Sequence, residues 1–431
     1  MPYEVMKIQE ISKPSKPSFE VKDISLAEQG KKQIEWAEVQ MVGLMKIRAR
    51  FKKEKPLAGV KIGMALHVTK ETAVLVRTLL DGGAEVAITG CNPLSTQDDV
   101  AAALAKDGVN VYAKRGVNKE DYYRFIHTIM DFEPNITIDD GCDLVSEIHT
   151  KRPELIKNII AGAEETTTGV IRLHAMVRDG ALKYPMIAVN DSNTKHLVDN
   201  YYGTGQSTLD GIIRATNVFI GGKNFVVAGY GPCGKGVALK ACGMGAHVIV
   251  TEVDAFRALQ AHFDGYRVMP MAEAAKIGDI FVTLTGDKNV IDIHHMKAMK
   301  TGAILANSGH FDAEINLKEL SKIAQKRNIR ANMDEYSFDG KKIFILGEGR
   351  LVNLAAAEGH PSLVMSFSFC DQALACEYAV KNKGKLNIAV HKLPDEVDDN
   401  VAKIHLEAMG IHFDVLTEEQ KKYLASWEEG T

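Results

Sequence analysis

The chain has 431 residues, of which 45% are hydrophobic and 25% are charged, and its formal net charge is −4. This length suits three ordinary domains or two larger ones and leaves ample sequence for hydrophobic cores. The mild charge, without a long basic run, argues against a nucleic-acid-binding surface and fits an enzyme with a small substrate.

The six cysteines form no CxxC pair, so we expect free thiols in a reducing compartment. The N-terminal stretch is polar and interrupted by prolines, unlike a signal peptide. Apolar runs are far too short to span a bilayer. We therefore expect a cytoplasmic protein that does not enter a membrane.

The first half of the chain alternates strand and helix patterns. Helices are predicted at residues 70–83, closed by Gly82 and Gly83, and at 93–108, opened by Ser95 or Thr96. Buried strands are predicted at residues 59–66, 84–90, 109–113 and 135–140. Short strands that alternate with helices indicate a parallel sheet.

A second α/β series begins near Gln206, with a predicted helix at residues 207–220. Strands are predicted at residues 224–229, 246–252, 267–271, 279–286 and 302–309. A long helix at 361–382 follows this series, and we expect it to return to the first domain. Residues 394–431 predict a charged helical tail with a cap at Thr417.

A GxGxxG motif, Gly229, Gly231 and Gly234, stands between a predicted strand and a predicted helix. The first glycine permits the tight turn, the second lets a pyrophosphate approach the backbone, and the third allows helix and strand to pack closely. Glu252 ends the next strand, where a carboxylate accepts ribose hydroxyls and repels a 2′-phosphate. The motif therefore favours NAD over NADP, although Arg257 nearby weakens that preference.

Six short polar clusters stand where predicted strands end, and the carboxyl ends of strands line the ligand crevice of open α/β sheets. The clusters are residues 66–72, 92–99, 138–143, 164–169, 190–200 and 307–312. Each cluster taken singly also fits an ordinary structural role. His67 could be a structural histidine with its hydrogen bonds made inside the protein, Asp139 and Asp140 could cap a turn, and Lys195 could be exposed to solvent. Their concentration around one nucleotide motif favours a site.

No metal site is expected, because no His, Cys or carboxylate set has zinc spacing and the adjacent pair His294–His295 does not present both rings to one ion on a helix. The chain also lacks a GxSxG motif and a P-loop.

The clusters LSTQDD, DDGCD, EETTTG, NDSNTK, GYGPCGKG and GHFD, with EGRLVNLAAAEGHPSLVMSFSF and LTEEQKKYL, together closely resemble the adenosylhomocysteinase (S-adenosyl-L-homocysteine hydrolase) family. The resemblance runs from Val21 to Tyr423. It implies a homotetramer, and in each subunit an α/β fold with a discontinuous substrate-binding domain (1–190 and 360–394), a Rossmann-type NAD-binding domain (206–358) and a C-terminal oligomerisation tail (395–431).

The resemblance also implies one tightly bound NAD per subunit that is recycled within a turnover. The ribose 3′-hydroxyl of S-adenosyl-L-homocysteine is oxidised, and the ketone makes the C4′ hydrogen acidic. Homocysteine leaves by elimination, water adds, and the ketone is reduced again to give adenosine. The net reaction is reversible hydrolysis of a thioether.

Residue roles follow from the same resemblance. Lys195 with Asp199 matches the pair that takes the 3′-hydroxyl proton, and burial near the cationic nicotinamide is expected to lower the lysine pKa. Asp140 matches the base for the C4′ proton. His67 and His310 match the groups that serve the leaving sulfur and the attacking water.

Binding roles follow too. Glu165, Lys195 and Asp199 match the family's ribose-binding positions. The positions of the family's adenine pocket are matched by Thr69, Glu71, His360 and Met365. A carboxylate at Glu71 accepts from an exocyclic amine, which argues for adenine over hypoxanthine. Besides the glycine motif, Glu252 and Arg257, the cofactor positions are Thr166, Thr167, Thr168, Asn200, Thr285, Asn307, Ser308, Gly309, His310 and Asn353.

The chain departs from the common family pattern at Pro232–Cys233 in the glycine loop, at Thr204, and in its tail, which lacks a Lys-and-Tyr ending and resembles archaeal and thermophilic members. Two other functions stay open. An ordinary 2-hydroxy-acid dehydrogenase would release NADH and would not need Asp140, Lys195 and Asp199. A non-catalytic NAD-binding relative would carry a long Ser-rich N-terminal extension.

Overall fold

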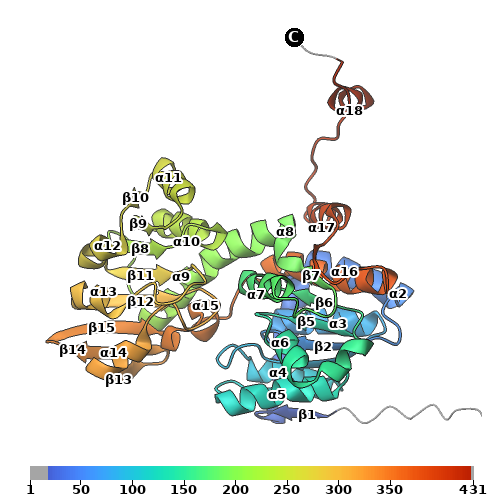
Figure 1. Ribbon diagram of the computed structural model, residues 1–431, viewed down its shortest axis with the longest axis horizontal. Helices are drawn as coiled ribbons and strands as arrows, with labels where there is room; N and C mark the ends of the chain where they lie inside the picture. The colour runs from blue at the N-terminus through green and yellow to red at the C-terminus, as the bar shows by residue number, and fades with distance from the viewer. Residues whose placement is uncertain (1–17, 429–431) are drawn as a thin grey trace, which may run out of the picture.

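The computed structural model describes residues 18–428, and these residues form two α/β units side by side (Figure 1). The expectation that the N-terminal stretch is no signal peptide concerns residues outside this range. Each unit contains an eight-stranded sheet. The predicted α/β class with a Rossmann-type nucleotide unit is confirmed.

The sheet of the first unit is parallel throughout, in the order β1-β4-β3-β2-β5-β6-β7-β16. Its strands are β1 (Phe19–Val21), β2 (Lys61–Ala65), β3 (Glu85–Thr89), β4 (Asn110–Ala113), β5 (Ile136–Asp139), β6 (Ala161–Glu164), β7 (Met186–Ala188) and β16 (Val390–Lys392). Central strands are buried on both faces, which explains their nearly continuous apolar sequences.

The sheet of the second unit has the order β10-β9-β8-β11-β12-β15-β14-β13, parallel from β10 to β15 and antiparallel beyond. Its strands are β8 (Asn224–Ala228), β9 (His247–Thr251), β10 (Arg267–Val268), β11 (Ile280–Thr283), β12 (Ala303–Asn307), β13 (Gln325–Arg330), β14 (Met333–Phe338) and β15 (Lys341–Leu346). The sequence patterns did not predict β13–β15, nor the short strands β1, β6, β7 and β16 of the first unit. Strand β13 is exposed at every residue and therefore shows no apolar alternation.

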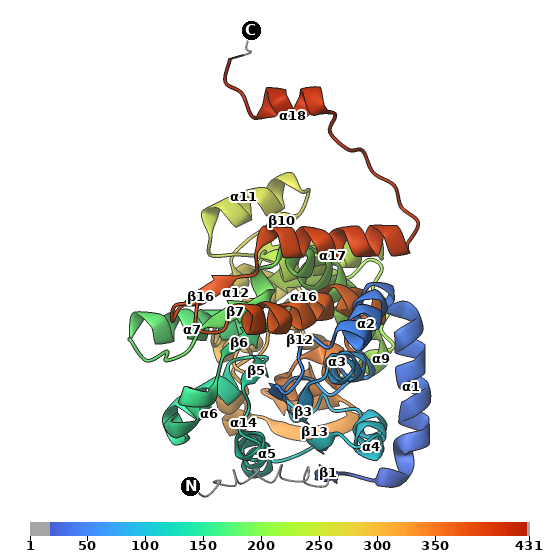
Figure 2. The same cartoon turned by 90° about the vertical axis from the view of Figure 1, so that its right-hand side faces the viewer.

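Helices cover both faces of each sheet (Figures 1 and 2). The first unit carries α1 (Ala27–Gln40), α2 (Val42–Glu54), α3 (Lys70–Asp81), α4 (Asp98–Lys106), α5 (Lys119–Asp131), α6 (Asp143–Lys151), α7 (Thr167–Arg178), α16 (Ser362–Lys381) and α17 (Asp395–Ala408). The second carries α9 (Thr204–Thr216), α10 (Pro232–Gly243), α11 (Ala255–Phe263), α12 (Met271–Ile277), α13 (Ile293–Ala298), α14 (Leu317–Ile323) and α15 (Val352–Ala355).

Three predicted boundaries were wrong for local reasons. The helix expected to open at Ser95 or Thr96 begins at Asp98, because Ser95 is buried and its hydroxyl bonds a histidine ring instead. The helix predicted to reach residue 220 ends at Thr216, followed by a left-handed Asn217. The strand predicted to reach residue 271 stops at residue 268, because Pro270 is the N-cap residue of α12, which begins at Met271.

The chain returns to the first unit after the second sheet is complete. Helix α16 contributes Phe369, Ala373 and Cys376 to the core of the first unit, and β16 pairs with β7 at its sheet edge. This return is the one that the long apolar helix pattern led us to expect. The exact domain boundaries stay a prediction.

The C-terminal segment leaves the body of the protein after α17 and ends in α18 (Glu418–Leu424), well away from both units (Figure 2). Its predicted cap is present: the Thr417 hydroxyl accepts the Gln420 N–H, and the Gln420 side chain accepts the Thr417 N–H. Within residues 18–428, no helix combines the length and apolar character that crossing a bilayer requires.

Candidate active site

A cavity of about 470 Å³ lies between the two units, at the carboxyl ends of their parallel strands. His67, Asp140 and Glu165 follow β2, β5 and β6, whereas Gly229 and Ser308 follow β8 and β12. Strand ends of open α/β sheets are the usual ligand crevice. Each sheet therefore directs its polar loops into one shared space.

Nearly all the residues that the sequence singled out line this cavity. They are His67, Thr69, Glu71, Asp140, Glu165, Thr166, Thr167, Thr168, Lys195, Asp199, Asn200, Gly229, Gly231, Glu252, Arg257, Thr285, Ser308, Gly309, His310, Asn353, His360 and Met365. Gly234 and Asn307 lie behind the cavity wall. The roles of the lining residues stay predictions.

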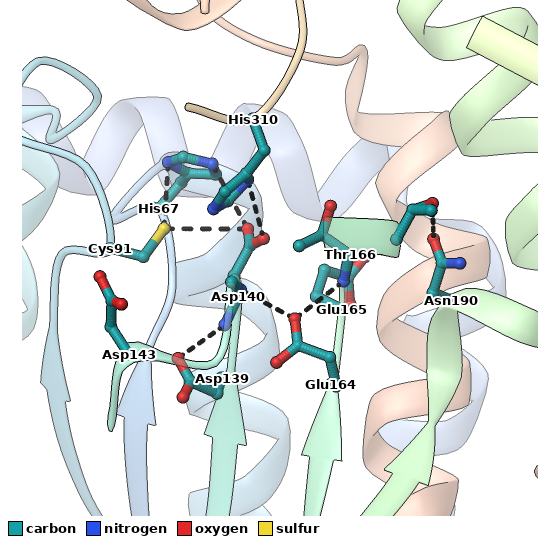
Figure 3. A network of polar contacts seen from close by, with 12 residues as sticks. His67, Cys91, Asp139, Asp140, Asp143, Glu164, Glu165, Thr166, Asn190 and His310 are labelled. Atoms are coloured by element: carbon teal, nitrogen blue, oxygen red, sulfur yellow. Dashed lines mark hydrogen bonds and ion pairs between the residues drawn. The ribbon is translucent and has the colours of Figure 1, made fainter. Parts of the chain in front are cut away.

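Asp140 lies between two histidine rings (Figure 3). Its Oδ2 is 3.3 Å from His67 Nε2, and its Oδ1 is 3.6 Å from His310 Nδ1. The other ring nitrogen of His67 lies 2.7 Å from Ser95 Oγ and 3.3 Å from Cys91 Sγ. Burial lowers the pKa of His67 to about 4, although Asp140 opposes this shift. The His67 ring is therefore neutral at neutral pH.

Two further carboxylates, Asp139 and Glu164, hold the backbone around Asp140. Asp139 accepts the N–H of Asp140 at 2.9 Å, and Glu164 accepts those of Gly141 at 2.8 Å and Thr166 at 3.1 Å. Burial raises the pKa of Asp139 to about 7 and that of Glu164 well above its usual value. Neither was predicted as a site residue, although an acidic residue at the end of each neighbouring strand was a visible signal.

Gly141 lets the two units approach each other at this point. Its φ is +105°, a left-handed conformation, and an added Cβ would lie 2.3 Å from His310 Nε2. A side chain at this position would therefore push His310, which comes from the second unit, away from Asp140.

Lys195 is buried among polar groups from its own helical segment and from Glu165, which follows β6. Its Nζ lies 2.8 Å from Asn200 Oδ1, 3.3 Å from Asp199 Oδ1 and 3.8 Å from Glu165 Oε1. Burial by itself lowers the pKa of Lys195, but Asp199, Glu165 and Asp140 outweigh it and raise that pKa above its ordinary value. Three carboxylates therefore stabilise the ammonium among the protein's own charges, and the lowering expected beside a cationic nicotinamide stays a prediction.

Lys195 ends the short helix α8 (Asn193–Lys195), which continues into a π-helical segment, η4 (His196–Gly203), and then α9. A π-helix is rare and occurs frequently at functional sites. This segment places Asp199 and Asn200 on the cavity side with Lys195. Burial raises the pKa of Asp199, but Lys195 and His360 reverse this effect and hold it below its usual range.

Glu165 is held from the opposite side by α16. Its carboxylate accepts hydrogen bonds from Ser368 Oγ and, at 2.6 Å, from Gln372 Nε2. Burial raises the pKa of Glu165 to about 7, although Lys195 opposes the shift. The returning helix thus fixes a carboxylate beside the predicted ribose site.

The predicted adenine end of the cavity is built from α3 and the start of α16. Glu71, in the first turn of α3, accepts a hydrogen bond from Ser362 Oγ at 2.6 Å. His360 Nε2 lies 3.4 Å from Asp199 Oδ1, while its Nδ1 lies 2.9 Å from Ser207 Oγ. Polar contacts therefore connect this end of the cavity to the Lys195 segment.

The glycine loop has the geometry that its motif predicts. Gly229 has φ +100°, and an added Cβ on Gly234 would lie 2.0 Å from Gly229 O, so the third glycine permits helix–strand packing. An added Cβ on Gly231 would meet only Arg257, at 3.9 Å, which leaves space over the loop for a phosphate. Glu252 accepts the Tyr230 N–H at 2.6 Å.

Other groups on this side also fit a dinucleotide. The Oδ1 of Asn353 is buried without a hydrogen-bond partner, although its Nδ2 donates to Ser207. Such an acceptor needs a donor, which the carboxamide of nicotinamide carries. The hydroxyls of Thr166–Thr168 and Thr285 line the same space. The residues present therefore fit NAD.

Asn307 does not contribute a free group to the cavity. Its Nδ2 donates to the carbonyl oxygens of Gly309, Phe311 and Gly349, at 2.9–3.1 Å, and its Oδ1 accepts from Thr283 Oγ1 and Gly309 N. All the hydrogen-bonding groups of its side chain are therefore used within the protein. Asn307 holds the loop that carries His310 in place and has no free group for a cofactor.

His67, Cys91 and Asp140 each offer one atom within 4.8 Å of the others, a group with metal-ligand chemistry within residues 18–428. Sequence spacing did not predict it, because the three residues follow different strands. Cys91 was not singled out either. The three side chains already contact one another, so we treat them as one polar network.

Sequence comparison agrees with this geometry. A sequence model described as S-adenosyl-L-homocysteine hydrolase, NAD binding domain, matches residues 200–359, and one described as S-adenosyl-L-homocysteine hydrolase matches residues 18–160. The adenosylhomocysteinases of Aquifex aeolicus and Saccharolobus solfataricus are both 59% identical, over 96% of this chain and 100% of theirs. The S-inosyl-L-homocysteine hydrolase of Methanocaldococcus jannaschii has the same identity and coverage.

The chain belongs to the S-adenosyl-L-homocysteine hydrolase family. This membership confirms the predicted resemblance, including the similarity to archaeal and thermophilic members. It also identifies NAD as the cofactor that the second unit binds. Relatives of equal identity carry two different substrate names, so family membership alone does not choose the purine base.

Proposed function

We propose that the protein catalyses the reversible hydrolysis of S-adenosyl-L-homocysteine to adenosine and L-homocysteine. The observation that supports this most is the position of Asp140, between His67 and His310 and in the same cavity as Lys195, Asp199 and the glycine loop. An ordinary dehydrogenase needs one proton acceptor, whereas this reaction needs one for the 3′-hydroxyl and another for C4′. The cavity provides both.

The bound NAD would be held by the glycine loop, Glu252 and Asn353, and it supplies a reversible two-electron oxidation at the ribose 3′-carbon and a positively charged ring. Lys195, assisted by Asp199, takes the 3′-hydroxyl proton during that oxidation. A positive charge beside Lys195 opposes its protonation, which counteracts the three carboxylates that raise its pKa. Asn200 Oδ1 keeps the Nζ in place through both protonation states.

Asp140 removes the C4′ proton once the neighbouring carbon is a ketone. The neutral ring of His67 lies 3.3 Å from this carboxylate, so it can take up the proton that Asp140 has removed from C4′ and pass it to the departing thiolate, which returns the ring to its neutral form. His310 closes the same side, from a loop fixed by Asn307. Each positioned acid or base typically contributes about 10²–10⁴ in rate. Glu165, whose pKa is about 7, binds the ribose hydroxyls.

A second candidate substrate, S-inosyl-L-homocysteine, follows from the name of the Methanocaldococcus jannaschii relative. Glu71 favours adenine instead, because a carboxylate accepts a hydrogen bond from the exocyclic amine of adenine and has no donor for the carbonyl oxygen of hypoxanthine. Ser362 holds Glu71 in place by donating to it. This contact supports adenine as the base.

One experiment tests the function directly. The purified protein, without added NAD, is incubated with S-adenosyl-L-homocysteine and separately with S-inosyl-L-homocysteine. We expect adenosine and homocysteine from the first at a far higher rate than inosine and homocysteine from the second. If the protein carries NAD and releases neither pair, the proposal is wrong; if it prefers the inosyl substrate, the base assignment is wrong.

We propose further that the protein is a cytoplasmic homotetramer with the domain boundaries given by the sequence. All six cysteines are free, which supports a reducing compartment. Large apolar side chains are strongly exposed on α11 and in the C-terminal segment, including Phe256 at 85%, Phe263 at 79% and Trp427 at 91%; exposed apolar surface of this kind marks association sites. A native mass of one subunit in solution would contradict the tetramer.

A further inference from the structure

The helix that carries Lys195 is capped by a residue about two hundred positions away in the sequence. Asp398, in the first turn of α17, accepts the backbone N–H of Asn193 and, at 3.1 Å, that of Thr194. Ser192 occupies the N-cap position of α8 but makes no capping bond. The first N–H groups of a helix lack intrahelical partners, so Asp398 supplies what the local sequence does not.

The hydroxyl of Thr194 connects Asp398 to a second buried carboxyl group, Asp371 of α16. Thr194 Oγ1 contacts Asp398 Oδ1 and lies 3.0 Å from Asp371 Oδ2. A hydroxyl has one proton to donate. With that proton directed to Asp398, the contact with Asp371 is a hydrogen bond only if Asp371 carries a proton of its own.

The surroundings of the two acids support this arrangement. Asp398 accepts two backbone N–H groups at the positive end of a helical segment, which stabilises its charge. Asp371 is fully buried and faces Asp398, Glu165 and Lys195; burial and then Asp398 raise its pKa well above its usual value. Because the one hydroxyl proton of Thr194 serves only one of these two contacts, the surroundings favour a protonated Asp371 that donates to Thr194, which in turn donates to Asp398.

We propose that Asp398, through this chain of hydrogen bonds from Asp371 and Thr194, positions Lys195 for the proposed reaction. Lys195 is the second residue after Asn193 on α8, and α8 continues without a break into the segment with Asp199 and Asn200. The inference rests on the proposed function. It makes α17, which follows both sheets in the sequence, a supporting element of the active site.

The first test compares Asp398→Asn with Asp399→Asn, its neighbour on the exposed side of the same helix. An asparagine has one acceptor oxygen in place of two, so one of the two backbone N–H groups loses its acceptor and the negative charge is removed, while size is kept. We expect kcat of the Asp398→Asn holoenzyme to fall about 10²-fold, as for a catalytic group displaced by about 1 Å. We expect KM and the affinity for adenosine to change much less than kcat, and Asp399→Asn to match the wild type.

A second readout isolates the step that Lys195 serves. Adenosine added to the holoenzyme reduces the bound nicotinamide, which is followed by its near-ultraviolet absorbance. We expect Asp398→Asn to slow this reduction by the same factor as kcat. A wild-type rate in folded Asp398→Asn, or an equal loss in Asp399→Asn, would overturn the proposal.

Paired variants keep the proposal testable if Asp398→Asn does not fold. Thr194→Val removes the bridging hydroxyl and should lower kcat, whereas Thr194→Ser should restore it. Asp371→Leu should lower kcat, whereas Asp371→Asn, whose NH₂ group can donate to Thr194 as the protonated acid does, should restore it. Equal loss in both members of each pair would show that the geometry, and not the hydrogen-bond chain, matters, and would contradict the proposal.

Hydrogen exchange separates this inference from the proposed function. In the wild type we expect slow exchange of the Asn193 and Thr194 amides, and faster exchange in Asp398→Asn but not in Asp399→Asn. If the wild type hydrolyses neither substrate yet shows this pattern, the function is wrong and the cap stands. If the protein is an active hydrolase and the two amides exchange fast in the wild type, the cap is wrong and the function stands.

Discussion

The two walls of the cavity are built from different kinds of groups. The first unit, with the Lys195 segment, presents buried ionisable side chains, such as Asp140, Glu165 and Lys195. Apart from His310, which reaches across to Asp140, the second unit presents a glycine turn, hydroxyls and an amide, and its charged residues Glu252 and Arg257 are partly or fully exposed.

This difference separates proton transfer from cofactor binding. Buried carboxylates and a buried lysine interact strongly and shift one another's pKa values, which a proton-transfer site requires. A glycine loop binds phosphate through backbone N–H groups and shape, which requires no titratable side chain. Substitutions on the first wall should therefore change rates, and substitutions on the second should change cofactor retention.

The largest effect is expected for Asp140→Asn, which removes the proposed C4′ base without changing its size. We expect homocysteine release to fall by about 10³–10⁴, the upper part of the range for a positioned base. Reduction of the bound cofactor by adenosine should persist, because Lys195 serves that step. If both reactions fall together, the two steps do not have separate bases.

A change in the other wall should act through the cofactor. In Gly234→Ala the new Cβ would lie 2.0 Å from Gly229 O, so the loop must shift, at a cost of up to about 3 kcal/mol. We expect the purified variant to contain less NAD and to unfold at lower temperature. Gly243→Ala, at the far end of the same helix with open space around its Cβ, is the control and should retain NAD fully.

A smaller effect is expected for the purine base. Glu71→Gln gives the pocket a donor as well as an acceptor, so discrimination between adenosyl and inosyl substrates should fall. The expected loss in the ratio of kcat/KM values is about 10–10²-fold, which corresponds to one hydrogen bond to a charged group. Parallel kinetics with both substrates measure it. An unchanged ratio would remove Glu71 from base recognition.

The smallest effect concerns acid stability. The folded pKa of His67 is about 4 and its unfolded value is 6.5, so between these values the unfolded chain binds more protons. The stability that His67 contributes is present above pH 6.5 and is lost as pH falls toward 4. By linkage, the wild type should lose about 2 kcal/mol from this residue between pH 7 and pH 5.

Urea unfolding of the NAD-saturated wild type and His67→Gln at both pH values measures that contribution. We expect the wild type to lose more stability on acidification than the variant, because glutamine does not titrate. Equal losses would mean that the His67 ring is not buried neutral beside Asp140.

Sequence patterns predicted β2–β5, β8–β12 and the glycine turn, because these depend on local periodicity and backbone conformation; the short parallel strands β1, β6, β7 and β16 were not predicted. They failed where neighbours decide the outcome. Ser95 has the chemistry of a helix cap, but in the structure its hydroxyl contacts His67. Asn307 has the chemistry of a ligand-binding amide, but its side chain is hydrogen-bonded to its own loop, to Gly349 and to Thr283.

The family resemblance located the reactive groups, since nearly all of them line one cavity. It did not supply their electrostatics. The pKa of Lys195 depends on three carboxylates from β5, β6 and its own segment, and only one of these, Asp199, is close to it in the sequence. The role of Asp398 could not be predicted for the same reason, because nothing in the sequence near residue 398 indicates that its carboxylate accepts the backbone N–H of Asn193.

The sequence by itself determined the fold class, the nucleotide turn and the list of reactive side chains, because strand periodicity, glycine conformations and residue chemistry are local properties. Only the tertiary structure decided which groups hold a proton and which helix ends are satisfied. Those properties depend on burial and on charges brought together from distant parts of the chain, and Coulomb interactions follow distance in space rather than separation along the backbone.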